Sequence, residues 1–212
     1  MGKSHQQSKK HHKEISKSRR INIRKIRKYY LIVCEGEKSE PLYFEGLAKK
    51  LPRGQVTLDI IPTGKCKTAV IDCALDRQKA TSREYDQVWT VFDRDDFPAD
   101  SFNEAIRRGT EKRINCAYSN ESFELWYVLH FHYSDSALHR SRYIEILGRV
   151  LGVKYDKTDK EIYDKLQRCG DEAEAIKRAK SLFAKYDHRS PASENPSTTV
   201  YKLVEELNKY KQ

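Results

Sequence analysis

Two stretches of sequence decide the fold: YYLIVCEGEKSE at residues 29–40 and QVWTVFDRDD at residues 87–96. Each begins with a mostly apolar run of six residues, the length expected for a strand that is buried on both faces. Each run stops at an acidic residue, Glu35 in the first stretch and Asp93 in the second. The two stretches therefore predict two strands of a parallel sheet that present carboxylates at their carboxyl ends.

Strands and helices alternate around these two stretches. Further strands are expected at 56–61 (VTLDII) and 114–118 (INCAY). Apolar residues at helical spacing predict helices at 67–80 and 99–111, and another helix is expected directly after the first strand. Such alternation is typical of βαβ units. We therefore expect an α/β fold with an open, mainly parallel sheet and helices on both faces.

From residue 119 onward the sequence indicates helices. The segment SNESFELWYVLHF opens with two residues of the capping type, Ser119 and Asn120, and continues as an apolar-rich helix. Three more helices fit residues 140–150, 159–168 and 171–186. The last helix is expected to open at Asn195-Pro196, because proline suits the first turn of a helix.

The pattern predicts one domain over residues 29–212. It divides into an α/β core at 29–118 and a helical C-terminal part at 119–212. A chain of this length can bury a sizeable core without help from disulfides or a structural metal.

Positive charge is concentrated at the N-terminus. Residues 1–28 contain eleven Lys or Arg and one acid, a net charge of +10, so the 30 basic and 30 acidic residues that follow cancel. A basic arm of this kind suits the backbone of DNA or RNA, since each neutralised phosphate releases counterions. The alternative is a solvated leader that aids solubility. We expect residues 1–28 to form a disordered arm ahead of the domain.

Composition narrows the class of protein. Hydrophobic residues make up 38% and charged residues 34% of the 212 residues. No stretch approaches the roughly 20 apolar residues that a membrane-spanning helix needs, and no apolar segment of a secretion signal follows the N-terminal charges. The five cysteines form no CxxC pair and are expected to be reduced thiols. These features predict a cytoplasmic protein with no membrane partner.

Acidic residues follow three of the predicted strands: Glu35 with Glu37, Asp93 with Asp95, and Glu121. Ligands of open parallel sheets bind at the carboxyl ends of the strands, where these side chains would meet. Carboxylates that close repel one another unless a cation lies between them, and all-oxygen donors favour Mg²⁺ or Mn²⁺ over zinc. Taken singly, each acid is better explained by a helix cap or a solvated loop. A DxD after one buried strand together with an ExE after another favours a metal site.

Four blocks of the sequence resemble the signature blocks of the RloB-like family. They are YYLIVCEGEKSEPLYFEGL, YDQVWTVFDRDDF, SNESFELWYVLHF and NPSTTVYKLVEEL, and they leave only the arm outside the resemblance. The family is similar to Toprim domains, the catalytic fold of topoisomerases, primases and Old-type nucleases. The resemblance therefore implies a Toprim-like catalytic core and a link to restriction loci and phage defence in bacteria or archaea.

The resemblance also implies roles for particular residues. In Toprim proteins a glutamate after the first strand acts as general acid or base, and a DxD after a later strand holds Mg²⁺. By position these are Glu35, and Asp93 with Asp95, so all three are expected to be catalytic and to bind the metal. Glu121 is a fourth candidate metal ligand. Glu124, one helical turn further on, fits the same crevice or a buried ion pair equally well.

Three residues are candidates for holding a substrate phosphate. Lys38 stands at the start of the first expected helix, whose N-terminal amides attract anions. Asn195 opens the last expected helix, and the loop before it carries His188 and Arg189 as cationic contacts. A purely structural cap explains Asn195 equally well. We expect Lys38, Arg189 and Asn195 to reach the acidic crevice.

Together these features predict a Mg²⁺-dependent phosphodiesterase, a nuclease acting on DNA or RNA in prokaryotic anti-phage defence. The oligomeric state and a partner protein from a defence locus stay open. The alternative is a non-catalytic nucleic-acid-binding or regulatory module whose acidic cluster binds metal. A phosphatase of the haloacid dehalogenase type also carries a DxD, but its motif usually follows the first strand. A P-loop is excluded, because GKCKT at 64–68 lacks the required glycine and hydroxyl residue.

Overall fold

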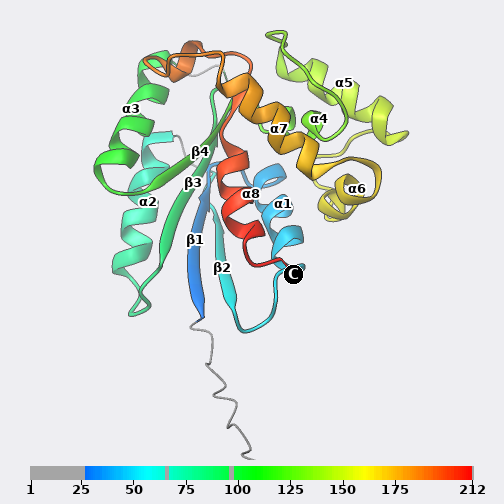
Figure 1. Ribbon diagram of the computed structural model, residues 1–212. Coiled ribbons are helices and arrows are strands. Elements are labelled where there is room, and N and C mark those ends of the chain that lie inside the picture. Colours follow the sequence, from blue (N-terminus) through cyan, green and yellow to red (C-terminus); the bar gives the residue numbers. More distant parts are fainter. Residues whose placement is uncertain (1–26, 65–66, 96–97, 212) are drawn as a thin grey trace, which may run out of the picture.

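The computed structural model of the protein describes residues 27–64, 67–95 and 98–211. They form an α/β fold built on a five-stranded, mostly parallel sheet, as predicted (Figure 1). The strands are β1 (Lys28–Cys34), β2 (Val56–Pro62), β3 (Gln87–Asp93), β4 (Asn115–Asn120) and β5 (Ser197–Thr198). Their order across the sheet is β2-β1-β3-β4-β5, with the first four strands parallel and β5 antiparallel to β4.

Helices cover both faces of the sheet. They are α1 (Ser39–Ala48), α2 (Lys67–Lys79), α3 (Ala99–Glu111), α4 (Glu124–Leu129), α5 (Arg140–Leu151), α6 (Ile162–Cys169), α7 (Glu172–Phe183) and α8 (Val200–Asn208), with a short 3-10 helix, η1 (Pro191–Ser193). Helices α2 and α3 lie on one face, and α1 and α8 lie on the other (Figure 1). Helices α4 to α7 gather on the α1 side at the carboxyl-terminal end of the sheet (Figure 1).

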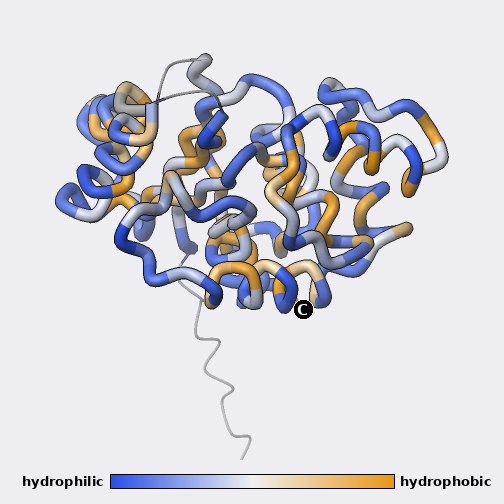
Figure 2. Tube along the Cα trace, turned by 90° about the horizontal axis from the view of Figure 1, so that it is seen from above, coloured by the Kyte–Doolittle hydropathy of each residue, from blue (hydrophilic) through white to orange (hydrophobic). Residues whose placement is uncertain are grey.

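The side chains of β1 explain why the sheet needs cover on both faces. Tyr30, Ile32 and Cys34 join the core that contains α1 and α8, whereas Leu31 and Val33 join the core formed with α2. All five are buried, and alternate residues of a strand point to opposite faces. The helices that cover the sheet show hydrophobic and hydrophilic segments in turn (Figure 2), as expected of helices with one face on a core.

The strand order creates a topological switch point between β1 and β3. The chain passes from β1 to β2 on one side and then returns to β3 and β4 on the other side. In doubly wound sheets, ligands bind in the crevice outside the carboxyl ends of the two strands at such a point. Glu35 follows β1 directly and Asp93 is the last residue of β3, so both acids lie at this position.

Two predicted helix starts are wrong. Ser119 and Asn120 do not open a helix but end β4, and α4 begins at Glu124. The last helix begins at Val200 rather than at Asn195. Both differences have one cause, because β5 pairs with the end of β4 and holds both segments extended. Capping residues are visible in a sequence, whereas a strand partner far away along the chain is not.

The boundary of the basic arm also differs from expectation. Lys28 is the first residue of β1, and its ammonium lies 2.6 Å from Asp86. Residues 1–26 and Cys66 lie outside the described residues, while the four described cysteines are free thiols. Among the described helices, none combines the length and the apolar composition needed to cross a bilayer.

Candidate metal and phosphate site

The structure brings Glu35 and Asp93 together, although they are 58 residues apart in sequence. The two strands that carry them are neighbours in the sheet, and the Glu35 N–H donates to the Val91 carbonyl at 2.8 Å. The Asp93 N–H in turn donates to Oε2 of the Glu35 carboxylate at 3.3 Å. The pairing of β1 with β3 therefore fixes the first two predicted catalytic residues beside each other.

These two acids open onto a cleft of about 480 Å³ at the carboxyl ends of β1 and β3. Its walls carry both signs of charge. The lining residues are Glu35, Gly36, Glu37, Lys38, Ser39, Glu40, Gly64, Asp93, Asp95, Glu124, Arg140 and Lys157. Of the predicted site residues, Glu35, Lys38, Asp93 and Asp95 line this cleft.

Glu40, which the sequence reading did not single out, is buried in the cleft wall. It lies in the first turn of α1 and is only 6% exposed. Its carboxylate packs against Gly36, where an added Cβ would lie 2.2 Å from Oε2, so a side chain at position 36 would force the Glu40 carboxylate to move. Burial, helped by the charges of Glu124 and Glu35, raises the pKa of Glu40 from 4.5 to about 7. The cleft therefore concentrates negative charge that it does not fully neutralise.

Asp93 shows the same excess of negative charge. Burial and the neighbouring carboxylates of Glu40 and Glu124 raise its pKa well above the ordinary value. Its Oδ1 atom is buried and has no hydrogen-bond partner among the described residues. A buried carboxylate oxygen without a donor is costly unless something else satisfies it.

Asp95 lies one residue beyond Arg94 in a left-handed backbone conformation, with φ of 43°. Its Oδ1 atom accepts a hydrogen bond from Nη1 of Arg140, the first residue of α5, at 3.0 Å. The helical part of the chain thus reaches across to the end of β3.

Glu124 lines the cleft and is also a buried ion-pair partner. Both of the roles that were expected as alternatives are therefore present. Its side chain is 1% exposed, and Nζ of Lys157 lies 3.1 Å from its Oε1. The hydroxyls of Ser39 and Tyr155 donate to the same oxygen at 3.0 and 3.2 Å. Burial alone would raise the pKa of Glu124, but Lys157 and the hydroxyls of Ser122 and Ser39 hold it below the ordinary value.

The donor chemistry of the cleft fits a hard cation. Glu35, Asp93 and Asp95 offer only carboxylate oxygens, which suit Mg²⁺ or Mn²⁺. The buried Oδ1 of Asp93, which accepts no hydrogen bond from the described residues, could coordinate such an ion. Within the described part of the chain, however, no group of three or more His, Cys, Asp or Glu side chains is gathered closely enough to hold a metal ion. Metal binding here requires side-chain movement, and the ion pair between Asp95 and Arg140 is one contact that must loosen.

The fourth candidate ligand, Glu121, does not line the cleft. Its carboxylate lies 3.9 Å from Nε2 of His139, just ahead of α5. Its backbone carbonyl accepts the N–H of Asp95 at 3.0 Å, so it stands next to the site without directing its side chain there.

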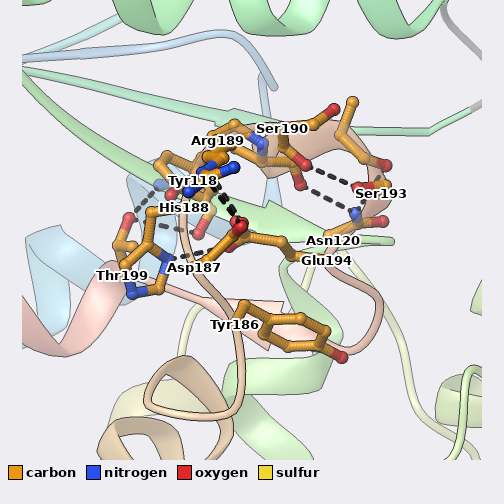
Figure 3. A network of polar contacts seen from close by, with 12 residues as sticks. Tyr118, Asn120, Tyr186, Asp187, His188, Arg189, Ser190, Ser193, Glu194 and Thr199 are labelled. Carbon is orange, nitrogen blue, oxygen red and sulfur yellow. Dashed lines mark hydrogen bonds and ion pairs between the residues drawn. The ribbon is translucent and has the colours of Figure 1, made fainter.

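Arg189 lies elsewhere as well. It belongs to the loop before η1, where its side chain is 88% exposed and pairs with Asp187 at 3.2 Å (Figure 3). Together with His188 and Arg107 it lines a separate cavity of about 410 Å³ against α3. The structure therefore does not bring the predicted cationic loop to the acidic cleft.

The predicted anion site at Asn195 does not form either. Asn195 precedes β5 rather than a helix, so no first-turn amides are available beside it. The surrounding loop is held to the end of β4 by hydrogen bonds, because the amide of Asn120 donates to the carbonyls of Pro191 and Ala192 (Figure 3). Within the loop, Nδ1 of His188 lies 3.0 Å from the Glu194 carboxylate.

Sequence reasoning missed Glu40, Arg140 and Lys157. Glu40 lies within the quoted EGEKSE block, and its position in the turn after a strand was the available signal. Arg140 and Lys157 lie in polar segments of the helical part, where nothing in the local pattern distinguishes them from solvated residues.

The family match agrees with this architecture. A family model described as RloB-like protein matches residues 30–207, a range that begins in β1 and ends in α8. A search of curated proteins and a search of solved structures each find no match. Because the family match takes in both the sheet and the helical part, the chain belongs to the RloB-like protein family.

Proposed function

We propose that this protein is a nuclease, a phosphodiesterase that depends on Mg²⁺ or Mn²⁺ and acts on DNA or RNA. The observation that carries the proposal is the juxtaposition of Glu35 and Asp93 at the switch point of the sheet, in a cleft that also contains Asp95 and cationic side chains. The resemblance to Toprim domains, which use a glutamate and a DxD in these positions, supports the same assignment.

Each group has a role that its position supports. Asp93, Asp95 and Glu35 would hold the ion, which when bound supplies charge stabilisation for the phosphoryl oxygens and a more acidic water. Glu35 also lies where it can exchange a proton with the attacking or leaving oxygen. Lys38 precedes α1 at the rim of the cleft and can hold a phosphate by its charge.

The basic arm supports nucleic acid as the substrate class. Nine Lys or Arg fall within residues 1–26, and such a density of positive charge favours a polymer of phosphates over a small substrate. A role in prokaryotic anti-phage defence is part of the proposal and rests on the family resemblance alone. The cytoplasm is the compartment that such a role requires.

A cleavage assay with the full chain tests the proposal. Labelled single-stranded DNA, duplex DNA, RNA and tRNA are incubated with Mg²⁺, with Mn²⁺ or with a chelator, using the wild type and Asp93→Asn. Asp100→Asn, on the exposed start of α3, is the matched control. We expect metal-dependent cleavage by the wild type and the control only. Binding without cleavage would favour a non-catalytic module, and cleavage by Asp93→Asn would overturn the assignment.

A further inference from the structure

Lys157 faces the acidic wall of the cleft from the helical part of the chain. It lies in the loop between α5 and α6, and its ammonium contacts Glu124 at 3.1 Å. Unlike Glu124, which is 1% exposed, the Lys157 side chain remains 45% exposed and lines the cleft. A lysine that served only to neutralise Glu124 would not need this exposure.

The loop holds Lys157 in a fixed place. Two residues before it, Tyr155 is buried, and its hydroxyl donates to Glu124 at 3.2 Å. Directly before it, Asp156 accepts hydrogen bonds from the N–H and the hydroxyl of Thr158, at 2.8 and 2.7 Å. The backbone of Lys157 is therefore held between the buried Tyr155 and the hydrogen-bonded turn from Asp156 to Thr158. This restraint reduces the conformational entropy that would be lost when a ligand binds.

The charges of the cleft show why a phosphate needs this residue. The lining includes six carboxylates (Glu35, Glu37, Glu40, Asp93, Asp95 and Glu124) and three cations (Lys38, Arg140 and Lys157). Arg140 is engaged by Asp95 at 3.0 Å. A phosphodiester entering the cleft would meet repulsion from the carboxylates, so it must be held by these cations.

Lys38 lies near the same loop. The pKa of Asp156 is lowered mainly by its hydrogen bonds from Thr158, and the charge of Lys38 adds to the effect. The hydroxyl of Ser39, the residue after Lys38, also lies 3.4 Å from that of Tyr155. Lys38 and the loop that carries Lys157 therefore lie near each other, and we call this part of the cleft its basic side.

We propose that Lys157 binds a backbone phosphate of the nucleic acid on the basic side of the cleft, with Glu124 and Tyr155 as its positioning residues. The polymer class rests on the proposed function, but the contact itself does not require turnover. The ammonium has three N–H donors, and Glu124 is its one acidic partner among the described residues. Donors therefore remain for a phosphate oxygen.

Binding measured without cleavage tests this proposal. Fluorescein-labelled single-stranded RNA and the matching DNA are titrated with the full chain in Ca²⁺ across a series of salt concentrations. We expect Lys157→Met to weaken binding about tenfold. The slope of log K against log salt should also fall by about 0.7, the value for one lost phosphate contact on a single strand. Lys154→Met, an exposed lysine of the same loop outside the cleft, should change neither quantity.

A double variant separates contact from structural support. Lys157→Met alone leaves the buried Glu124 carboxylate without its cation, so the fold itself could suffer. Combining it with Glu124→Gln removes that charge. If Lys157 binds phosphate, the double variant stays weak with the reduced slope. Recovery of wild-type binding in the double variant, or an unchanged slope in Lys157→Met, would overturn the proposal.

The outcome is independent of the nuclease proposal. A wild type that binds but never cleaves, with a reduced slope in Lys157→Met, supports the phosphate contact and contradicts the nuclease. A wild type that cleaves while Lys157→Met binds normally contradicts the contact alone. The arm is present in every variant, so its contribution cancels in the comparison.

Discussion

Nη1 of Arg140 lies 3.0 Å from Oδ1 of Asp95, joining the first residue of α5 to the residue two positions beyond the end of β3. Asp95 is one of the three carboxylates that we propose as metal ligands. The guanidinium therefore occupies a position where it competes with a divalent ion for the same oxygen.

Replacing Arg140 with Gln should tighten metal binding. The side chains of Arg140 and Asp95 are 37% and 31% exposed, so the ion pair contributes between a few tenths of a kcal/mol and about 1 kcal/mol. A metal ion that binds Asp95 must overcome this interaction energy. We expect a two- to fivefold lower Kd for Mn²⁺ by calorimetry, roughly the equivalent of that energy. Arg142→Gln, two residues further along α5 and paired with Glu145, is the control. Weaker metal binding in Arg140→Gln would show that Arg140 orients Asp95 instead of competing.

Asp93→Asn should raise the stability of the metal-free protein and abolish its response to metal. Burial and the charges of Glu40 and Glu124 disfavour the ionised carboxylate, and a neutral amide of the same shape removes this cost. We expect a gain of about 1 kcal/mol, a rise in Tm of about 2–4 °C. Thermal melts with and without Mn²⁺ measure both effects. A variant that is still stabilised by Mn²⁺ as strongly as the wild type would remove Asp93 from the metal site.

Glu40 should make the metal-free protein less stable as the pH rises. Its pKa is about 7 in the folded chain and near 4.5 when unfolded, so between these values the folded state keeps a proton that the unfolded state has lost. The stabilisation is complete below about pH 4.5 and is lost as the pH rises to about 7, a change of about 3 kcal/mol for this group. Above that pH the contribution is constant.

Glu40→Gln should remove the Glu40 part of this dependence, while the part due to Asp93, whose pKa is also raised, remains. Urea unfolding of the wild type and the variant, measured from pH 5 to pH 8 in the presence of a chelator, gives the free energy of unfolding at each pH. Glu45→Gln, an exposed position on the same helix, should follow the wild type. Parallel curves for the wild type and Glu40→Gln would contradict the raised pKa.

The strands and the acids at their ends could be predicted from the sequence, whereas the contribution of the helical part to the cleft could not. The strands at 56–61 and 87–92 are correct to within one residue. The central strand β3 is buried along most of its length and is therefore largely apolar, whereas the edge strand β2 is mostly half-buried and is recognised by its β-branched residues. Glu35, Lys38, Asp93 and Asp95 share the cleft because a parallel sheet aligns the ends of its strands. Local pattern and one general rule of topology suffice for this half of the site.

The other half depends on packing that local sequence does not encode. Lys157 reaches the cleft only because Tyr155 packs into the core beside Glu124, an interaction between distant elements. Asn120 resembles a helix cap in the sequence, yet its side chain donates hydrogen bonds to two backbone carbonyls of η1. The sequence alone does not show whether a polar residue caps a helix, is solvated or contacts a distant element, because that depends on a partner far away along the chain.

Asn120→Ala should destabilise the fold and spare the metal response. The side chain is 2% exposed, and its amide donates to the carbonyls of Pro191 and Ala192 at 3.2 and 3.0 Å. The Pro191 carbonyl keeps the Glu194 N–H as a donor, but the loss of two buried hydrogen bonds should still cost about 1–3 kcal/mol in the free energy of unfolding. Asn115→Ala, at the exposed start of the same strand, removes one longer hydrogen bond of 3.4 Å to the Val88 carbonyl and should cost clearly less than Asn120→Ala. Urea titration compares the three proteins, and equal effects at both positions would contradict the role of Asn120.

The pairing of β4 with β5 has a consequence for how such a protein can change over time. Asn120 and Ser197 are partners in adjacent strands, so residues 121–196 leave the sheet and return to it at neighbouring points. The helices of this segment contribute to the main core, but the loops that join them can change in length without disturbing the four parallel strands. Glu35 and Asp93 lie at the ends of sheet strands, whereas Glu124, Arg140 and Lys157 lie within residues 121–196. A change within residues 121–196 can therefore alter the cations of the cleft while Glu35 and Asp93 stay in place at the ends of β1 and β3.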